Sequence, residues 1–229
     1  MTDIHRRQVP TGPAASSQPS PTGGTRNLML VLATTGFALN FWAWALLSPL
    51  APRYKEQLGL SGGQQALLVA VPVIVGSLGR IPVGALTDRF GGRVMFPIIS
   101  VATIVPILFL GLFGQHSLAA LLVGGFFLGI GGTAFAIGVP FVNSWFPPER
   151  RGFAIGIFGA GMGGTAISAL TTVKLVKNVS EEAPFLITAA VLAVYAVVAW
   201  LFLRDAPGRV VPTTSVVSRL AAVSKLAVT

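Results

Sequence analysis

A single charged side chain lies inside the long apolar segments of this 229-residue sequence. It is Arg80, in the run VPVIVGSLGRIP at residues 71–82. The acidic residues all fall outside these segments, at Asp3, Glu56, Asp88, Glu149, Glu181, Glu182 and Asp205. An arginine at the centre of a bilayer costs roughly 2.5–3.5 kcal/mol, and such residues normally face a cavity or a partner. Because no carboxylate of the chain is placed to neutralise it, we expect the partner of Arg80 to be an anion from solution.

The chemistry of arginine narrows the class of anion. A guanidinium is a planar, weakly hydrated fork that donates to two oxygens at once, so it suits a small planar anion better than lysine does. A competing interpretation is that Arg80 snorkels to the membrane surface, since only about 9 Å of helix separates it from the end of its apolar segment at residue 86. The neighbouring Gly79 and Pro82 favour a kinked or closely packed site.

Glycines form a second unusual pattern at residues 152–166, which read GFAIGIFGAGMGGTA. Glycines four apart share a helix face, so the pairs Gly152/Gly156 and Gly159/Gly163 predict grooves where another helix approaches closely. The other interpretation is that bare backbone near the middle of the membrane lets a small substrate bind or pass. The two interpretations are compatible.

Two further side chains are candidates for the wall of a cavity. Asn40 lies near the middle of the first apolar segment and either lines a cavity or hydrogen-bonds to a neighbouring helix, which is the commoner arrangement. Phe135 provides either an aromatic wall or lipid-facing surface. Since the chain has no cysteine, two histidines and no acid at membrane depth, we expect no metal site, no cofactor and no enzymatic activity.

The elements that position these residues are six membrane-spanning helices. Hydrophobic residues make up 53% of the chain and charged residues 10%, where a soluble domain carries roughly 25% charge. At about 1.5 Å of rise per residue, each apolar segment can cross a hydrocarbon core of about 30 Å. We number them spans 1 to 6, at residues 28–50, 65–86, 94–113, 118–142, 152–173 and 183–203. Residues 1–27, rich in Pro, Ser, Thr and Gly, predict a disordered tail.

The basic residues predict the orientation in the membrane. An even number of spans puts both termini on one side, and eleven Lys and Arg residues lie on that side against four on the other. The first group is Arg6, Arg7, Arg26, Arg89, Arg93, Arg150, Arg151, Arg204, Arg209, Arg219 and Lys225; the second is Arg53, Lys55, Lys174 and Lys177. Both termini are therefore expected in the cytoplasm. The net charge of +9 then belongs to loops near anionic lipid, and no nucleic-acid partner is expected.

The connection between spans 2 and 3 carries a family signature. Residues 84–93 read GALTDRFGGR, which matches the G-x-L-x-D-R-x-G-x-R signature of the major facilitator superfamily of transporters at every fixed position. Glycines there allow close helix approach, and the aspartate offers a carboxylate to a helix N-terminus or a nearby arginine. The resemblance implies an all-α membrane protein whose six helices form one bundle of two inverted three-helix repeats, and two such bundles rock about a central site. It also implies a conformational latch formed by Gly84, Asp88, Arg89, Gly91 and Arg93.

Within that superfamily the chain resembles the nitrate/nitrite porter family. Arg80 followed by Ile-Pro is similar to the span 2 arginine that grips the anion there, and Phe135 matches the span 4 phenylalanine that flanks it. Residues 160–166 read AGMGGTA and resemble the span 5 signature A-G-x-G-N-x-G, with Gly164 in place of Asn and Ala166 in place of Gly. The resemblance implies a nitrate or nitrite transporter of a bacterial inner membrane that works by alternating access. The candidate substrate-binding residues are Arg80, Phe135, Asn40, Gly161, Gly163 and Gly164.

The resemblance covers one bundle of the two that the family has. Residues 204–229 look like a cytoplasmic linker truncated before a second bundle, which in the family supplies a second arginine to the anion. Three explanations for a single bundle are a disrupted reading frame, a split gene and a half-size protein that dimerises. A complementary six-helix half or a second copy is therefore an expected partner. Transport of another small anion or a drug, and a non-transporting membrane remnant, are the alternative functions.

Overall fold

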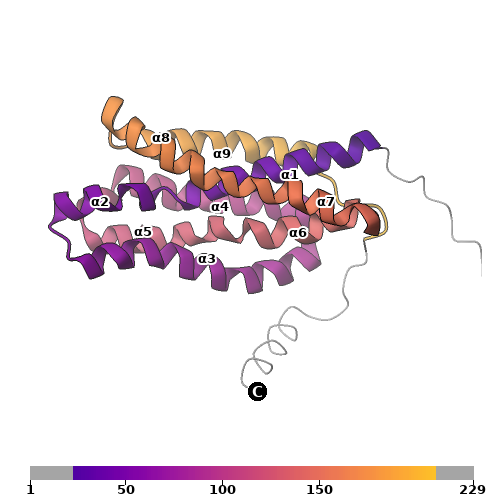
Figure 1. The fold of residues 1–229 in the computed structure, drawn as a ribbon, viewed down its shortest axis with the longest axis horizontal. Coiled ribbons are helices and arrows are strands. Elements are labelled where there is room, and N and C mark those ends of the chain that lie inside the picture. Colours follow the sequence, from indigo (N-terminus) through magenta and orange to yellow (C-terminus); the bar gives the residue numbers. More distant parts are fainter. Residues whose placement is uncertain (1–22, 210–229) are drawn as a thin grey trace, which may run out of the picture.

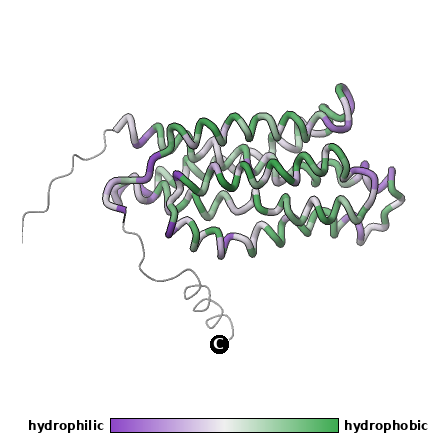
Figure 2. The backbone as a smooth tube through the Cα atoms, turned by 180° about the vertical axis from the view of Figure 1, so that it is seen from behind, coloured by the Kyte–Doolittle hydropathy of each residue, from purple (hydrophilic) through white to green (hydrophobic). Residues whose placement is uncertain are grey.

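The fold is a bundle of long apolar helices (Figure 1). A computed structural model describes residues 23–209, and its six helical segments of membrane-spanning length confirm the six predicted spans. No strand occurs among these residues. Hydrophobic residues follow the middle of the helices, and hydrophilic residues gather at the two ends of the bundle (Figure 2). This distribution is expected of a protein whose middle lies in lipid and whose ends meet water.

The helical elements join end to end into the six spans. Span 1 consists of α1 (Gly23–Trp44) and α2 (Leu47–Leu58), span 2 is α3 (Gly62–Phe90), and span 3 is α4 (Gly92–Leu112). After the short 3₁₀ helix η1 (Gly114–His116), span 4 consists of α5 (Leu118–Leu128), η2 (Gly129–Thr133) and α6 (Ala134–Trp145). Span 5 consists of α7 (Pro148–Gly159), η3 (Ala160–Gly163) and α8 (Gly164–Asn178), and span 6 is α9 (Ala183–Phe202).

The helices extend beyond the apolar segments. α1 begins at Gly23, which corrects the predicted boundary of the tail at residue 27; the rest of that tail lies outside the described residues. α2 carries Arg53 and its charged neighbours, which the sequence pattern placed in a connection. The reason is that hydropathy marks the part of a helix that lies in lipid, whereas the backbone stays helical until a residue ends it. Gly59, with a left-handed φ of 63°, ends α2, and a capping box between Ser61 and Gln64 starts α3.

Three spans are interrupted near mid-length. Span 1 turns at residues 45–46, and spans 4 and 5 pass through the 3₁₀ segments η2 and η3. Both 3₁₀ segments are rich in glycine, which lets neighbouring helices approach them closely. Short 3₁₀ stretches inside a helix often mark a functional hinge.

The spans pack as three pairs. Span 1 lies along span 5, span 2 along span 4, and span 3 along span 6. If spans 1, 2 and 3 correspond to spans 4, 5 and 6 of a second repeat, the pair of spans 1 and 5 corresponds to the pair of spans 4 and 2. The pair of spans 3 and 6 corresponds to itself, as two structural repeats require. Spans 1 and 4, which correspond in this way, are both interrupted. The pairing therefore agrees with the predicted pair of three-helix repeats.

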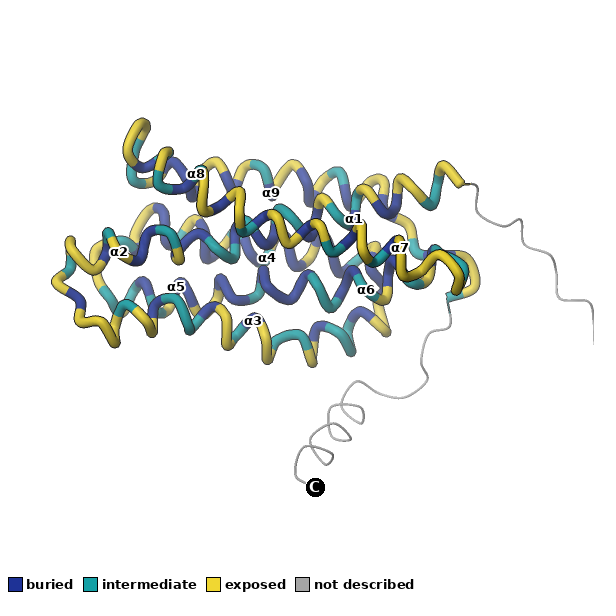
Figure 3. Tube along the Cα trace, viewed as in Figure 1, coloured by how far each residue is buried: buried dark blue, intermediate teal, exposed yellow. Residues whose placement is uncertain are grey.

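Spans 2 and 5 leave most of their surface uncovered (Figure 3). Only 22% of the apolar middle of span 2 and 28% of that of span 5 is buried, against 56% in span 3. Both ends of the described chain lie at the same end of the bundle (Figure 1). We call that end, which carries residues 84–93, the inner end, and the end that carries η1 the outer end.

Candidate functional site

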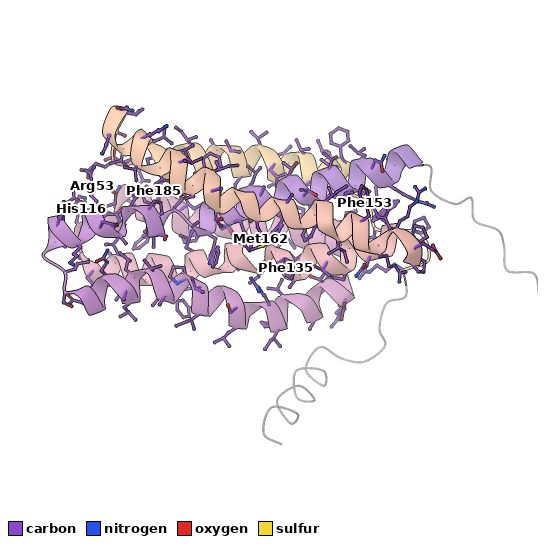
Figure 4. The ribbon with its side chains drawn as sticks, viewed as in Figure 1. Arg53, His116, Phe135, Phe153, Met162 and Phe185 are labelled. Carbon is purple, nitrogen blue, oxygen red and sulfur yellow. The ribbon has the colours of Figure 1, made fainter. Side chains whose placement is uncertain are left out.

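Arg80 extends from α3 toward the 3₁₀ segment of span 4. Its Nε donates a hydrogen bond to the carbonyl oxygen of Gly132 at 3.4 Å, and its Cζ lies 5.4 Å from the ring centroid of Phe135. Phe135 lies near the middle of the bundle's long axis, beside α3 (Figure 4). The apolar segment ends about 9 Å from Arg80, but the Arg80 side chain contacts Gly132 and Phe135 of span 4 and so is held within the bundle. This geometry disfavours the snorkelling interpretation.

The terminal nitrogens of Arg80 are available to a ligand. The residue is partly exposed, and neither Nη1 nor Nη2 has a hydrogen bond or an ion pair among residues 23–209. The acidic residues of that range all lie at helix ends or in connections. A guanidinium whose two terminal nitrogens are free can donate paired hydrogen bonds to two oxygens of one anion.

An aromatic cluster holds Phe135 in place. Its ring centroid lies 5.6 Å from that of Phe37 and 6.2 Å from that of Phe158. Phe37 and Phe158 stack at 4.7 Å with an interplanar angle of 18°, and both are fully buried. The cluster therefore connects spans 1 and 5 to the ring that faces Arg80. Sequence reasoning missed Phe37 and Phe158 because phenylalanine in an apolar segment carries no signal that separates it from ordinary packing.

Glycines bring spans 2 and 4 together beside Arg80. A Cβ atom at Gly76 would lie 2.9 Å from the carbonyl oxygen of Gly129, and one at Gly132 would lie 3.3 Å from the Cα of Gly76. Side chains at these positions would push the two spans apart and move the Gly132 carbonyl away from Arg80. Sequence reasoning missed these residues too, although the run GIGGT at residues 129–133 was a usable signal.

A hollow of about 260 Å³ lies on the outer side of this crossing. Spans 1, 2 and 5 line it, with Trp44, Ser48, Val73 and Thr165 among the lining residues. The indole N–H of Trp44 donates to a backbone carbonyl of span 2 at 3.0 Å, so it is not free for a ligand. Val73 lies two helical turns from Arg80 on the same face of α3. The hollow thus has an apolar wall with hydroxyl groups, and Arg80 is not among its lining residues.

The Asn40 side chain is engaged in hydrogen bonds within and between helices. It is fully buried, and its Nδ2 donates to the carbonyl of Gly36 at 2.8 Å and to Oγ of Ser100 at 2.9 Å. The second bond connects span 1 to span 3, which is the interhelical arrangement that the sequence left open. Its Oδ1 is buried and has no hydrogen-bond partner among the described residues.

The glycines of span 5 divide into two groups. Gly161 and Gly164 are buried against α1, where a Cβ at Gly161 would lie 3.0 Å from the carbonyl oxygen of Thr34. Gly163 is exposed, with nothing within 4 Å of a Cβ position. A Cβ position is equally open at the other members of the predicted groove pairs, Gly152, Gly156 and Gly159, so no helix among residues 23–209 packs closely on these four glycines. Helix packing therefore falls on Gly161 and Gly164, two of the three span 5 residues predicted to touch substrate, and the predicted grooves are open.

The predicted latch lies at the inner end, where α3 meets α4. The guanidinium of Arg89 lies over the ring of Phe90, with its Cζ 5.4 Å from the centroid. Gly84 has nothing within 4 Å of a Cβ position, so no helix approaches it among the described residues. Gly91 is the buried turn between the helices, with φ of 85°. Asp205, which the sequence did not single out, places a carboxylate at the N-terminus of α4.

The outer end is closed by a separate polar cluster. Arg53 pairs with Glu181, and the hydroxyl of Tyr54 donates to the Gln115 side chain at 3.2 Å (Figure 4 labels Arg53). In the connection before α9, the backbone N–H of Glu182 and the Ser180 hydroxyl hold the pKa of Glu182 below its ordinary value. These contacts join the end of span 1 to the connections that follow spans 3 and 5, far from Arg80, so they are no part of the candidate site.

Fold and site together define a polytopic membrane protein of six spans, with one cation at mid-bundle and an uncovered face beside it. The family model described as "Major Facilitator Superfamily" matches residues 33–227. The chain therefore belongs to the major facilitator superfamily, which confirms the family predicted from residues 84–93.

Its curated relatives carry names related to nitrate and nitrite. The chain is 48% identical over 201 residues to "Probable nitrate/nitrite transporter NarK2" of Mycobacterium tuberculosis, which covers 87% of this chain and 51% of that protein. It is 37% identical over 177 residues to "Nitrite extrusion protein" of Bacillus subtilis, covering 77% of this chain and 44% of that protein. The chain thus spans about half the length of these relatives.

A solved structure supports the fold. A bacterial homologue of the human lysosomal transporter Spinster, in an inward-facing and unoccupied conformation, superposes with a TM-score of 0.70. The match covers 85% of this chain and 47% of that one at 21% sequence identity, so it supports the fold alone.

Proposed function

We propose that this chain is the N-terminal half of a nitrate/nitrite transporter that works by alternating access, with Arg80 gripping the anion. The observation that carries the proposal is the guanidinium of Arg80, which lies at mid-bundle with both terminal nitrogens free and with no acidic residue near it in the described sequence. The names of the relatives support the choice of nitrate and nitrite.

The chemistry of the site fits a small planar anion. Nitrate offers coplanar oxygens that a guanidinium meets with two parallel N–H donors, whereas a lysine ammonium meets them as a point charge. The Phe135 ring holds the guanidinium from one side by a cation–π contact. Asn40, Gly161 and Gly164 are buried between helices, so we propose that these three residues shape the site and do not touch the anion. Gly163 is exposed.

The setting proposed for the chain is a bacterial inner membrane with both termini in the cytoplasm. The excess of Lys and Arg at the inner end supports this orientation. A second bundle, either a complementary half or a second copy, would cover the exposed faces of spans 2 and 5 and supply a second cation to the anion.

Arg80→Lys tests the proposal. We expect nitrate uptake to fall roughly tenfold or more, because lysine loses one of two charge-assisted hydrogen bonds. Uptake of ¹⁵N-nitrate and ¹⁵N-nitrite is measured in vesicles from cells that express the chain alone or together with the C-terminal half of a relative. Arg150→Lys, at an exposed position in the first turn of α7, is the matched control.

Each outcome separates the alternatives. Equal uptake by Arg80→Lys and Arg150→Lys removes Arg80 from the mechanism. Inhibition of uptake by an organic anion or a drug at lower concentration than by nitrite would assign another cargo. Absence of flux with any complementary half would identify a non-transporting remnant.

A further inference from the structure

The chain does not leave the bundle where span 6 ends. Residues 203–209, which we call the strap, cross the inner end after α9, and Leu203 and Ala206 are buried there. The backbone N–H of Arg204 donates to the sulfur of Met29 at 3.3 Å, and its carbonyl accepts from the indole N–H of Trp145 at 3.2 Å. The first described residues of the predicted linker are therefore packed against spans 1 and 4; residues 210–229 lie outside the described part of the chain.

Two charged side chains of the strap hold the turn between α3 and α4 from both sides. Asp205 accepts a hydrogen bond from the backbone N–H of Arg93 at 3.1 Å, at the start of α4. Arg209 donates to the carbonyl oxygens of Asp88 at 2.8 Å and of Thr87 at 3.4 Å, at the end of α3. The two side chains also pair with each other at 3.2 Å.

Each contact has the sign that the adjacent helix end favours. The first N–H groups and the last carbonyls of a helix have no partner within it, and they carry about half a positive and half a negative charge respectively. Asp205 places a carboxylate on the first of these ends, and Arg209 places a guanidinium on the second. Charge-assisted hydrogen bonds of this kind are stronger than neutral ones.

Gly91 makes the arrangement possible. Its φ of 85° is a conformation that other residues rarely adopt, and a Cβ atom there would overlap the carboxylate of Asp205 and the guanidinium of Arg209. A side chain at Gly91 would therefore displace the charged groups of Asp205 and Arg209, in addition to straining its own backbone.

We propose that Asp205 and Arg209 are positioning residues of the transport latch. They fix the facing ends of α3 and α4 across Gly91 and couple this turn to the strap. The consequence for transport rests on the proposed function, whereas the contact itself is measured without any substrate.

Hydrogen exchange of the turn tests the proposal on the purified full chain. The Arg93 amide owes its protection to Asp205, since it lies in the first turn of α4. We expect Arg209→Gln to accelerate exchange of amides 91–95 by about tenfold, while a peptide from the outer half of α3 stays unchanged. Arg204→Gln, an exposed strap residue with the same change of charge, is the matched control and should leave the turn as it is. Equal exchange in the two variants overturns the proposal.

Two further variants separate capping from simple ion pairing. The double variant Asp205→Arg with Arg209→Asp keeps the ion pair but reverses its sign at both helix ends, so it should not restore protection. Arg209→Lys keeps the cation at the end of α3 and should restore part of it. Full rescue by the double variant, or none by Arg209→Lys, contradicts the capping role. If Arg209→Gln does not fold, Arg209→Lys and Asp205→Asn provide the same comparison.

The two proposals fail separately. Arg80→Lys should change uptake without changing exchange at residues 91–95. The strap variants should change that exchange whether or not the cargo is nitrate. If the strap variants leave the exchange of amides 91–95 unaltered, only this inference is overturned.

Discussion

Arg80 is held by weak contacts, and such contacts suit its proposed role of binding an anion and releasing it. Its one hydrogen bond within the described residues is long, at 3.4 Å. Its contact with the Phe135 ring orients the guanidinium but brings no negative charge to neutralise it. A carboxylate in the same place would compete with the anion for the guanidinium. The aromatic cluster of Phe37, Phe135 and Phe158 orients the side chain without neutralising it.

Phe135→Leu, a change in the residue that contacts Arg80, should weaken anion binding. Loss of an exposed or partly desolvated cation–π contact is worth about 0.5–1 kcal/mol, which corresponds to a two- to fivefold rise in the KM of nitrate uptake. The measurement is the concentration dependence of ¹⁵N-nitrate uptake by the chain with a complementary half. Phe153→Leu, an exposed phenylalanine near the inner end, should leave KM unchanged (Figure 4). An unchanged KM for Phe135→Leu would show that the ring has no part in binding.

At the scale of elements, the glycines of span 5 have two different tasks. Gly164 lies on α1, and a Cβ there would overlap the backbone of Ala38. Gly163, the preceding residue, has open space around it. The pair therefore offers a comparison of the same substitution at neighbouring positions of one helix.

We expect Gly164→Ala to destabilise the chain by about 1–3 kcal/mol, because two backbones must separate to accept the methyl group. Gly163→Ala should be neutral or stabilise by up to about 1 kcal/mol, since alanine favours helix over glycine. Thermal unfolding of the purified chain in detergent, followed by tryptophan fluorescence, measures both. Similar unfolding temperatures for the two variants would mean that span 5 does not pack on α1 through Gly164.

Much of the architecture could be predicted from sequence because lipid imposes a strong pattern. Apolar length set the number of spans, and the spacing of residues 84–93 set the family. The roles of Gly161, Gly163 and Gly164 could not be assigned, because the sequence gives the faces of a helix but not which face meets a neighbour. Asp205 and Arg209 were missed since they follow the last span, where charges are expected for reasons of topology alone. The Gly132 carbonyl was missed because a backbone acceptor has no sequence signal.

At the scale of the whole molecule, orientation can be tested with single cysteines, because the chain has none of its own. Gly62→Cys, at the outer end of α3, should react with a membrane-impermeant maleimide added to intact spheroplasts. Arg150→Cys, at the inner end, should react only after the membrane is opened. Both positions are exposed, so access to protein surface does not separate them. The reverse pattern of labelling would place both termini outside the cytoplasm.

The open face of span 5 leads to the last prediction. Gly152, Gly156, Gly159 and Gly163 follow one stripe of that span, and no described residue covers them. A second bundle that packs there would bring a helix close to bare backbone, so a side chain at this stripe would block the contact. In the isolated chain the same side chain would clash with no described residue. Gly156→Leu should therefore leave the unfolding temperature of the isolated chain unchanged or slightly raised, but reduce co-purification of the C-terminal half of a relative by at least about tenfold. Gly84→Leu, in open space at the inner end of α3, tests span 2 in the same way. Undiminished co-purification in both variants would place the second bundle on another face, and Arg80 would then face lipid instead of a shared cavity.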